Sequence, residues 1–200
     1  MSVSMAGMKN SEIVIGEGIT EKFYILSLLD TVKIKPTPII VKPYNMDELD
    51  KAIKHHAIEG RTAIHCLIDM DNKVNNDSNM SKYKKLKQKY DGKAVKGTDC
   101  FVRFYESLPS IEQFLYYYFE YSNAVKTNAG LKSWLHHKSG YEVSDKWFKG
   151  HSIHNTLIKS GGCLSNAIIN AKNSVRHRPN ESYDYSYTEV GEFIEHLGVK

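Results

Sequence analysis

The stretch Thr62-Ala63-Ile64-His65-Cys66-Leu67-Ile68-Asp69-Met70-Asp71 decides the fold prediction. From Thr62 to Ile68 it is apolar on both faces apart from His65, which is typical of a central strand in a parallel sheet covered on both sides. His65 is therefore interpreted as a core histidine rather than a catalytic base. Asp69 and Asp71 follow the strand directly. Because sites in open parallel sheets form beyond the carboxyl ends of the strands, this stretch also predicts where function resides.

Strand and helix patterns alternate on both sides of this stretch. Short apolar runs predict further strands at 12–16, 39–41 and 100–105. Helical spacing predicts helices after Thr20, which is a candidate N-cap, from Asn45 or Asp47 to Gly60, at 82–90 and at 111–121. Such alternation predicts an α/β domain over residues 11–122, with a parallel sheet flanked by helices.

After Asn123 only helix patterns remain. They lie at 131–137, 153–159, 164–175 and 188–197. Residues 123–200 are therefore predicted to form a helical C-terminal extension that packs on the sheet domain.

Composition bounds the class of protein. The 200 residues are 41% hydrophobic and 25% charged, which excludes a wholly disordered chain. The net charge of +4 permits an anionic partner without requiring one. Three cysteines without a CxxC pair argue against a disulfide framework, and no histidine or cysteine spacing predicts a zinc site. Without an apolar leader at the start or a long apolar run, we expect a cytoplasmic protein with no membrane segment.

Carboxylates follow three of the predicted strands. Glu17 follows the first, Asp69 and Asp71 follow the third, and Glu112 follows the fourth. In extended backbone Asp69 and Asp71 point the same way, and carboxylates sharing a face repel one another unless a cation lies between them. Mg²⁺ or Mn²⁺ prefers such oxygen ligands, and a third carboxylate from Glu17 would suit metal-assisted phosphoryl transfer. The alternative is that these acids are turn and cap residues.

Three short motifs carry a family resemblance. They are Glu17-Gly18-Ile19-Thr20-Glu21, Ile68-Asp69-Met70-Asp71 and Ser107-Leu108-Pro109-Ser110-Ile111-Glu112. Together they resemble the TOPRIM domain of topoisomerases, primases and OLD-family nucleases. The closer resemblance is to the RloB-like branch, which is associated with bacterial defence and restriction loci. It covers about residues 13–197.

The resemblance implies roles for these acids. Glu17 would be a metal ligand or a general acid/base, and Asp69 and Asp71 would be catalytic metal ligands. Glu21 and Glu112 would complete a second metal site. Relatives often carry Glu-Gly-Glu where this chain has Ile19 as the third residue, so one acid is absent.

Basic residues are candidates for nucleic-acid contacts. A lysine-rich run after Asp71 includes Lys82, Lys84 and Lys85, and a second group includes Arg176 and Arg178. They could follow a phosphate backbone beside the metal site. Equally, the lysines could be a solvated helix face, and the arginines could complement a helix C-terminus.

These observations predict a divalent-metal-dependent nuclease that cleaves phosphodiester bonds in DNA or RNA, using Mg²⁺ or Mn²⁺. The resemblance implies bacterial antiphage defence or restriction as its setting. It leaves room for an activating or inhibitory partner protein, such as an ATPase, and for homo-oligomers. The alternative function is a non-catalytic module of a defence complex that binds metal and nucleic acid.

Overall fold

The computed structural model describes residues 12–32, 38–40, 43–178 and 182–199. The strands are β1 (Glu12–Gly16), β2 (Ile39–Ile40), β3 (Ala63–Asp69), β4 (Lys93–Ala94), β5 (Phe101–Leu108) and β6 (Tyr187–Thr188). The helices are α1 (Ile19–Thr31), α2 (Met46–Ile58), α3 (Asp71–Val74), α4 (Asp77–Tyr90), α5 (Glu112–Tyr116), α6 (Asn128–Ser139), α7 (Asp145–Gly150), α8 (Ile153–Lys159), α9 (Leu164–Arg176) and α10 (Val190–His196).

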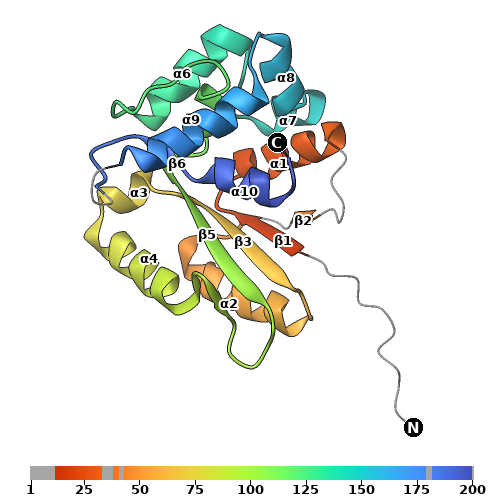
Figure 1. Ribbon diagram of the computed structural model, residues 1–200, viewed down its shortest axis with the longest axis vertical. Coiled ribbons are helices and arrows are strands. Elements are labelled where there is room, and N and C mark those ends of the chain that lie inside the picture. Colours follow the sequence, from red (N-terminus) through yellow and green to blue (C-terminus); the bar gives the residue numbers. More distant parts are fainter. Residues whose placement is uncertain (1–11, 33–37, 41–42, 179–181, 200) are drawn as a thin grey trace.

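One mixed, mostly parallel sheet organises the protein (Figure 1). Its strand order is β2-β1-β3-β5-β4, and β6 pairs with β5. The neighbours β2, β1, β3 and β5 are all parallel. This confirms the α/β prediction and places the carboxyl ends of β1, β3 and β5 at one edge.

Alternating side chains of the central strands feed two separate cores. Ile64, Cys66 and Ile68 of β3 point into a core shared with α2 and α4. Leu67 points to the opposite face, into a core shared with α1, α5 and the helices after residue 123. Since successive strand residues face opposite sides, a continuous apolar run is what a doubly covered strand requires.

Two short strands were not predicted. β4 and β6 both pair antiparallel with β5. The prediction of only helices after Asn123 is therefore wrong at Tyr187–Thr188, where a short pair without an apolar β-branched run adds to the sheet. Thr188, predicted to begin the last helix, instead lies in β6.

Some helix boundaries also differ from the predictions. The helix predicted at 111–121 is only the short α5, followed by turns to Phe119. Gly18, not Thr20, is the N-cap of α1, whereas Asn45 caps α2 by accepting a hydrogen bond from the Glu48 N–H. Val41, predicted to end the second strand, and the outermost domain residues 11 and 200 lie outside the described residues.

Among the residues described, none of the helices is long and apolar enough to cross a membrane.

Candidate metal centre

The loop after β1 places two glutamates at the carboxyl edge of the sheet. Glu17 leaves the strand, and Glu21 lies in the first turn of α1, where it is buried. The Gly18 N–H donates to Oε1 of Glu21 at 3.2 Å, as in a helix capping box. A side chain at Gly18 would meet Oε2 of Glu21 at 2.9 Å, so this glycine leaves space for the carboxylate.

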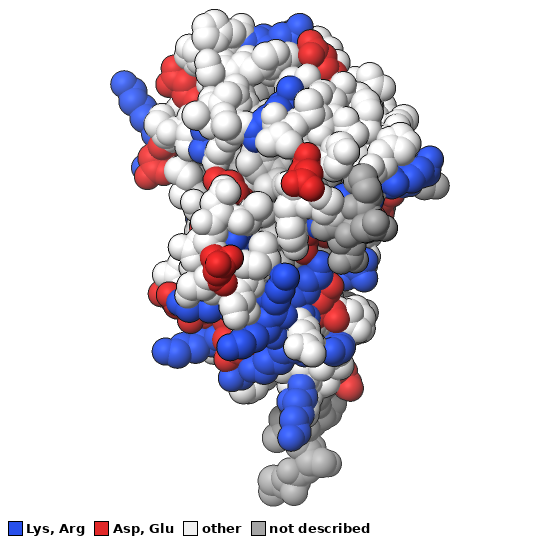
Figure 2. All heavy atoms as spheres, turned by 90° about the vertical axis from the view of Figure 1, so that its left-hand side faces the viewer, with Lys and Arg blue, Asp and Glu red and all other residues white. Residues whose placement is uncertain are grey.

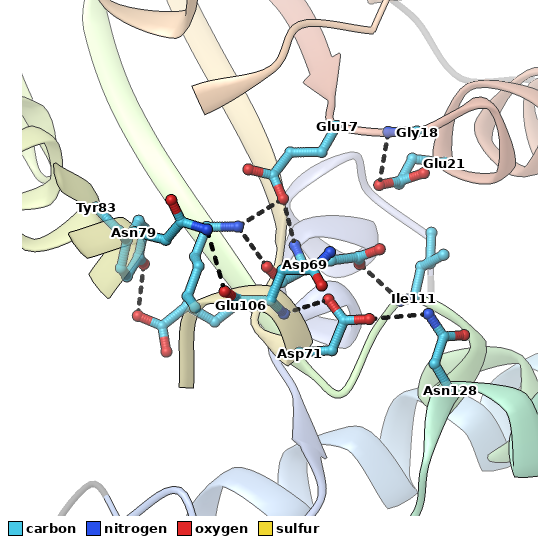
Figure 3. A network of polar contacts seen from close by, with 12 residues as sticks. Glu17, Gly18, Glu21, Asp69, Asp71, Asn79, Tyr83, Glu106, Ile111 and Asn128 are labelled. Carbon is cyan, nitrogen blue, oxygen red and sulfur yellow. Dashed lines mark hydrogen bonds and ion pairs between the residues drawn. The ribbon is translucent and has the colours of Figure 1, made fainter. Parts of the chain in front are cut away.

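Asp69 ends β3, the neighbour of β1, and lies beside Glu17 (Figure 3). Its backbone N–H donates to Oε2 of Glu17 at 3.2 Å. Its own carboxylate accepts a hydrogen bond from the Ile111 N–H at 2.9 Å. The parallel register of β1 and β3 thus joins two acids that are 52 residues apart.

Glu112 enters the same region from the segment after β5. Its carboxylate is buried and accepts hydrogen bonds from the hydroxyls of Ser110 at 2.6 Å and Tyr141 at 3.0 Å. Lys132 of α6 lies 3.7 Å from its Oε1. Donors from the C-terminal region therefore fix this acid in place.

Burial and mutual repulsion make this an unusual group of acids. We call Glu17, Glu21, Asp69 and Glu112 the carboxylate cluster. Burial raises the pKa of Glu17, raises that of Glu21 to about 7 and raises that of Asp69 well above its ordinary range. The charge of Glu112 further raises the pKa values of Glu21 and Asp69. Shifts of this kind mark sites where the negative charge is incompletely balanced.

Lys73 is the functional candidate that sequence reasoning missed. It lies in α3 and is buried, and its ammonium donates to Oε2 of Glu17 at 2.7 Å and to the carbonyl oxygen of Asp69 at 2.5 Å. In the sequence it reads as one more lysine near a basic run. Its spacing of four residues from Asp69 was the only available signal.

The carboxylate of Asp71 is directed toward Asn128 of α6 (Figure 3). The chain turns helical at Met70, so Asp71 begins α3 instead of continuing the strand. Its carboxylate accepts hydrogen bonds from the Asn72 N–H at 2.6 Å and the Asn128 side-chain amide at 3.1 Å. The expectation that Asp69 and Asp71 point the same way is therefore wrong, because it assumed an extended backbone.

A pocket of about 560 Å³ opens beside Asp71. It is lined by the loop after β5 and by residues of the C-terminal region, including Asn128 and Tyr183. The Oδ1 atom of Asn128 is buried without a hydrogen-bond partner. The pocket is therefore lined by the Asp71 carboxylate and by the residue of α6 that bonds it.

The donor set fits a hard divalent cation in its chemistry. All of the candidate ligands are oxygens, as Mg²⁺ and Mn²⁺ prefer. The carboxylates of the five predicted acids, all of them among the described residues, do not surround a single point. No three of them bring oxygens within 4.8 Å of one another. Lys73, bonded to Glu17, supplies a positive charge at this edge.

Glu106 provides a contrast within the same protein. It is buried in β5, and Lys87 and Arg178 approach its carboxylate at 2.5 and 3.6 Å. Burial alone would raise the pKa of Glu106, but the Lys87 charge and hydrogen bonds from Tyr83 and Tyr187 hold it below its ordinary value. Basic and hydroxyl partners therefore compensate the negative charge of buried Glu106, whereas the partners of the carboxylate cluster do not prevent raised pKa values at Glu17, Glu21 and Asp69.

The predicted basic residues separate into different environments. Lys84 and Lys85 are exposed on α4, whereas Lys82 lies 2.7 Å from Asp47. Figure 2 shows basic side chains gathered over the lower half of one face, the side on which Figure 1 places α4. Arg176 is exposed at the end of α9, but Arg178 is largely buried against Glu106 and the ring of Tyr187. Arg178 is therefore paired with Glu106 inside the protein and is not exposed as a nucleic-acid contact would need to be.

Fold and site together define an α/β protein with an acidic cluster at the carboxyl edge of a mostly parallel sheet. The model of the RloB-like protein family matches residues 13–197, and the chain belongs to this family. No curated protein and no solved structure matches the chain.

Proposed function

We propose that this protein is a divalent-metal-dependent nuclease that hydrolyses phosphodiester bonds in DNA or RNA, and that it serves in bacterial antiphage defence. The observation that carries the proposal is the carboxylate cluster. Burial raises the pKa values of Glu17, Glu21 and Asp69, and repulsion from other members of the cluster raises those of Glu21 and Asp69 further. A cluster of this kind gains stability when a cation binds between its members.

The proposal assigns a role to each group of residues. Glu17, Asp69 and Glu112 would hold Mg²⁺ or Mn²⁺, with Glu21 next to them. Asp71, bonded to Asn72 and Asn128, would act from the adjoining pocket. Such an ion, when bound, stabilises charge that develops on a phosphoryl oxygen and favours ionisation of a water molecule. Lys73 would orient Glu17 through the 2.7 Å ion pair.

Proton transfer falls to a carboxyl group with a raised pKa. A general acid or base works best when its pKa lies near the working pH. Burial moves the pKa of Glu17 in this direction, and Glu17 lies at the strand end beside Asp69. Glu17 would therefore accept a proton from the attacking water or give one to the leaving oxygen.

Substrate binding is assigned to exposed basic side chains on α4 and at the end of α9. Lys84 and Lys85 would contact the phosphate backbone, because they are exposed on α4, which packs against α3 next to the cluster. Arg176 is a second exposed candidate. Such contacts position a nucleic acid without reading its sequence.

A cleavage assay tests this function. Plasmid DNA, single-stranded DNA and total tRNA are incubated with Mg²⁺, Mn²⁺ or EDTA. The proposal expects metal-dependent cleavage that falls about 100-fold or more in Asp69→Asn. The matched control is Asp99→Asn, since Asp99 is exposed in the turn before β5 and should be dispensable. Cleavage retained in Asp69→Asn, with circular dichroism showing folded protein, would contradict the proposal.

The second candidate is a binding module without catalysis. It is favoured by one observation: no three of the predicted acids bring their oxygens within 4.8 Å of one another. Salt-dependent nucleic-acid binding by folded protein, without cleavage of any of these substrates, would support this alternative.

A further inference from the structure

A second cluster of metal-ligating side chains lies at the opposite edge of the sheet. It consists of Glu12 at the start of β1, His65 of β3 and His196, the last residue of α10. Oε2 of Glu12 lies 3.2 Å from Nε2 of His65 and 3.4 Å from Nε2 of His196. Glu12 pairs with Ala63 at the amino ends of the strands, whereas Asp69 lies at the carboxyl end. The two sites are therefore separate.

The spacing of these atoms matches a tetrahedral metal site. Zinc binds histidine nitrogen and carboxylate oxygen at about 2.0 to 2.2 Å, so neighbouring ligand atoms lie about 3.3 to 3.6 Å apart. The two distances to Glu12, 3.2 and 3.4 Å, are close to this range. One ligand atom from each of the three residues lies within 4.8 Å of the others.

His65 is held in an orientation that suits a ligand. It is buried, with its ring packed against Tyr105 and Phe193. Its Nδ1 lies 3.4 Å from the Tyr105 hydroxyl, while its Nε2 faces Glu12. Metal-binding histidines usually engage their second nitrogen in this way, which fixes the ring and the tautomer.

Space for further ligands adjoins the cluster. His65 and His196 line an open pocket of about 380 Å³. Three protein ligands with an accessible fourth position are typical of zinc sites that accept water or a small molecule. Arg103 also lines the pocket, and its guanidinium lies 3.9 Å from the Glu192 carboxylate, which offsets its charge.

We propose that Glu12, His65 and His196 form a Zn²⁺ site that links α10 to strands β1 and β3. Two imidazoles and one carboxylate suit zinc and related transition metals, whereas Mg²⁺ prefers oxygen alone. The three ligands come from residues as far apart as Glu12 and His196. Binding would therefore tie the C-terminal helix to the first strand and stabilise the folded chain.

A competing histidine group allows a matched control. His55, His56 and Glu59 also bring ligand atoms within 4.8 Å of one another. They come from α2 and the residue that follows it, and His55 and Glu59 are exposed. The three residues lie within five positions along one helix and its C-cap, so a metal bound there would not connect separate helices or strands.

Calorimetric titration of the chelator-treated protein with Zn²⁺ tests the proposal, with Co²⁺ absorption as a report of tetrahedral geometry. In an Asp69→Asn background, which weakens the proposed Mg²⁺ or Mn²⁺ site, we expect one strong Zn²⁺ site per chain and a rise in melting temperature with Zn²⁺. His196→Gln is the main variant, because the ring is half exposed and its loss should not prevent folding. It should weaken Zn²⁺ binding at least about tenfold and abolish the Zn²⁺-dependent rise, whereas His55→Gln should change neither.

Two outcomes would overturn the proposal. Absence of Zn²⁺ binding would show that Glu12 and the two histidines form only an ion-paired cluster. Binding lost in His55→Gln and kept in His196→Gln would place the metal on α2 instead.

Discussion

The ammonium of Lys73 lies 2.7 Å from Oε2 of Glu17, and both side chains are largely shielded from solvent. The same ammonium also bonds the carbonyl oxygen of Asp69. This lysine thus places a positive charge at the point where β1 and β3 deliver their acids. Its removal should expose how strongly the acids repel one another.

Lys73→Met should lower the free energy of unfolding by about 3 kcal/mol, because it leaves a buried carboxylate without its partner. The double variant Lys73→Met/Glu17→Gln should recover most of this loss. Urea denaturation at pH 8 measures both. Lys82→Met is the matched control: its ion pair with Asp47 is exposed and should contribute about 1 kcal/mol or less. Additive losses in the double variant would show that Lys73 and Glu17 do not interact energetically.

Stability without metal should fall as the pH rises from 4.5 to beyond 7. Burial raises the pKa of Glu21 from 4.5 to about 7. In this window the folded protein keeps a proton that the unfolded chain releases, so the stabilising contribution is complete below pH 4.5 and lost above pH 7. Glu21→Gln should flatten the decline. Urea denaturation between pH 5 and pH 8 measures it.

Glu189 supplies the control for this pH effect. Burial raises its pKa to about 7 as well, but it bonds the Glu106 N–H instead of joining the carboxylate cluster. Both glutamates should contribute to the decline, and Mg²⁺ should reduce only the part that Glu21→Gln removes. An effect of Mg²⁺ that disappears in Glu189→Gln and persists in Glu21→Gln would refute the assignment.

Two glycines should separate folding from metal binding. A side chain at Gly16 would meet the Glu21 Cβ at 2.7 Å, which cannot move without the helix backbone. At Gly18 it would meet only the carboxylate end of Glu21. Gly16→Ala should therefore cost about 1 to 3 kcal/mol of stability. Gly18→Ala should mainly weaken Mn²⁺ binding. Thermal denaturation and Mn²⁺ titration together distinguish the two, and equal stability losses would contradict this account.

The basic residues should differ in what they contribute. Lys84→Glu/Lys85→Glu should weaken nucleic-acid binding and reduce its dependence on salt, since each exposed lysine that contacts a phosphate releases about one counterion. Arg178→Met should instead reduce stability, because it leaves Glu106 with one cation fewer. Fluorescence anisotropy at several salt concentrations measures the first effect, with exposed Lys159→Glu on α8 as control. An unchanged salt dependence would show that Lys84 and Lys85 do not contact the nucleic acid.

The main sheet could be predicted because its central strands carry long apolar runs. Strand β3 is buried on both faces, and the almost wholly apolar run from Ile64 to Ile68 indicates this burial. The antiparallel additions β4 and β6 were missed because neither Lys93–Ala94 nor Tyr187–Thr188 forms an apolar β-branched run, whereas the equally short β2 consists of two isoleucines.

The proximity of Glu17 and Asp69 could be predicted from the sequence, whereas the direction of the chain after Asp69 could not. The rule for parallel strands brings Glu17 and Asp69 together. It could not show that the chain turns helical at Met70, which separates Asp71 from Asp69 and brings Lys73 back to the cluster. That turn depends on tertiary hydrogen bonds, since the N–H groups of Met70 and Asp71 both donate to the carbonyl oxygen of Pro109.

The partners of His65 could not be predicted from the sequence either. Glu12 and His196 approach it only because the sheet register and the last helix place them there. Local spacing indicated a core histidine, which its burial supports, but gave no sign of a three-residue cluster.

Mn²⁺ binding to the carboxylate cluster is the most direct test of the central claim. Electron paramagnetic resonance counts free Mn²⁺ in the presence of His196→Gln protein, a background that removes the proposed second metal site. We expect Mn²⁺ binding that weakens at least about tenfold on adding Asp69→Asn or Glu17→Gln and that is unchanged by Asp99→Asn. Binding that is absent, or equally strong with and without the Asp69 carboxylate, would contradict the claim that this cluster is a divalent-cation site.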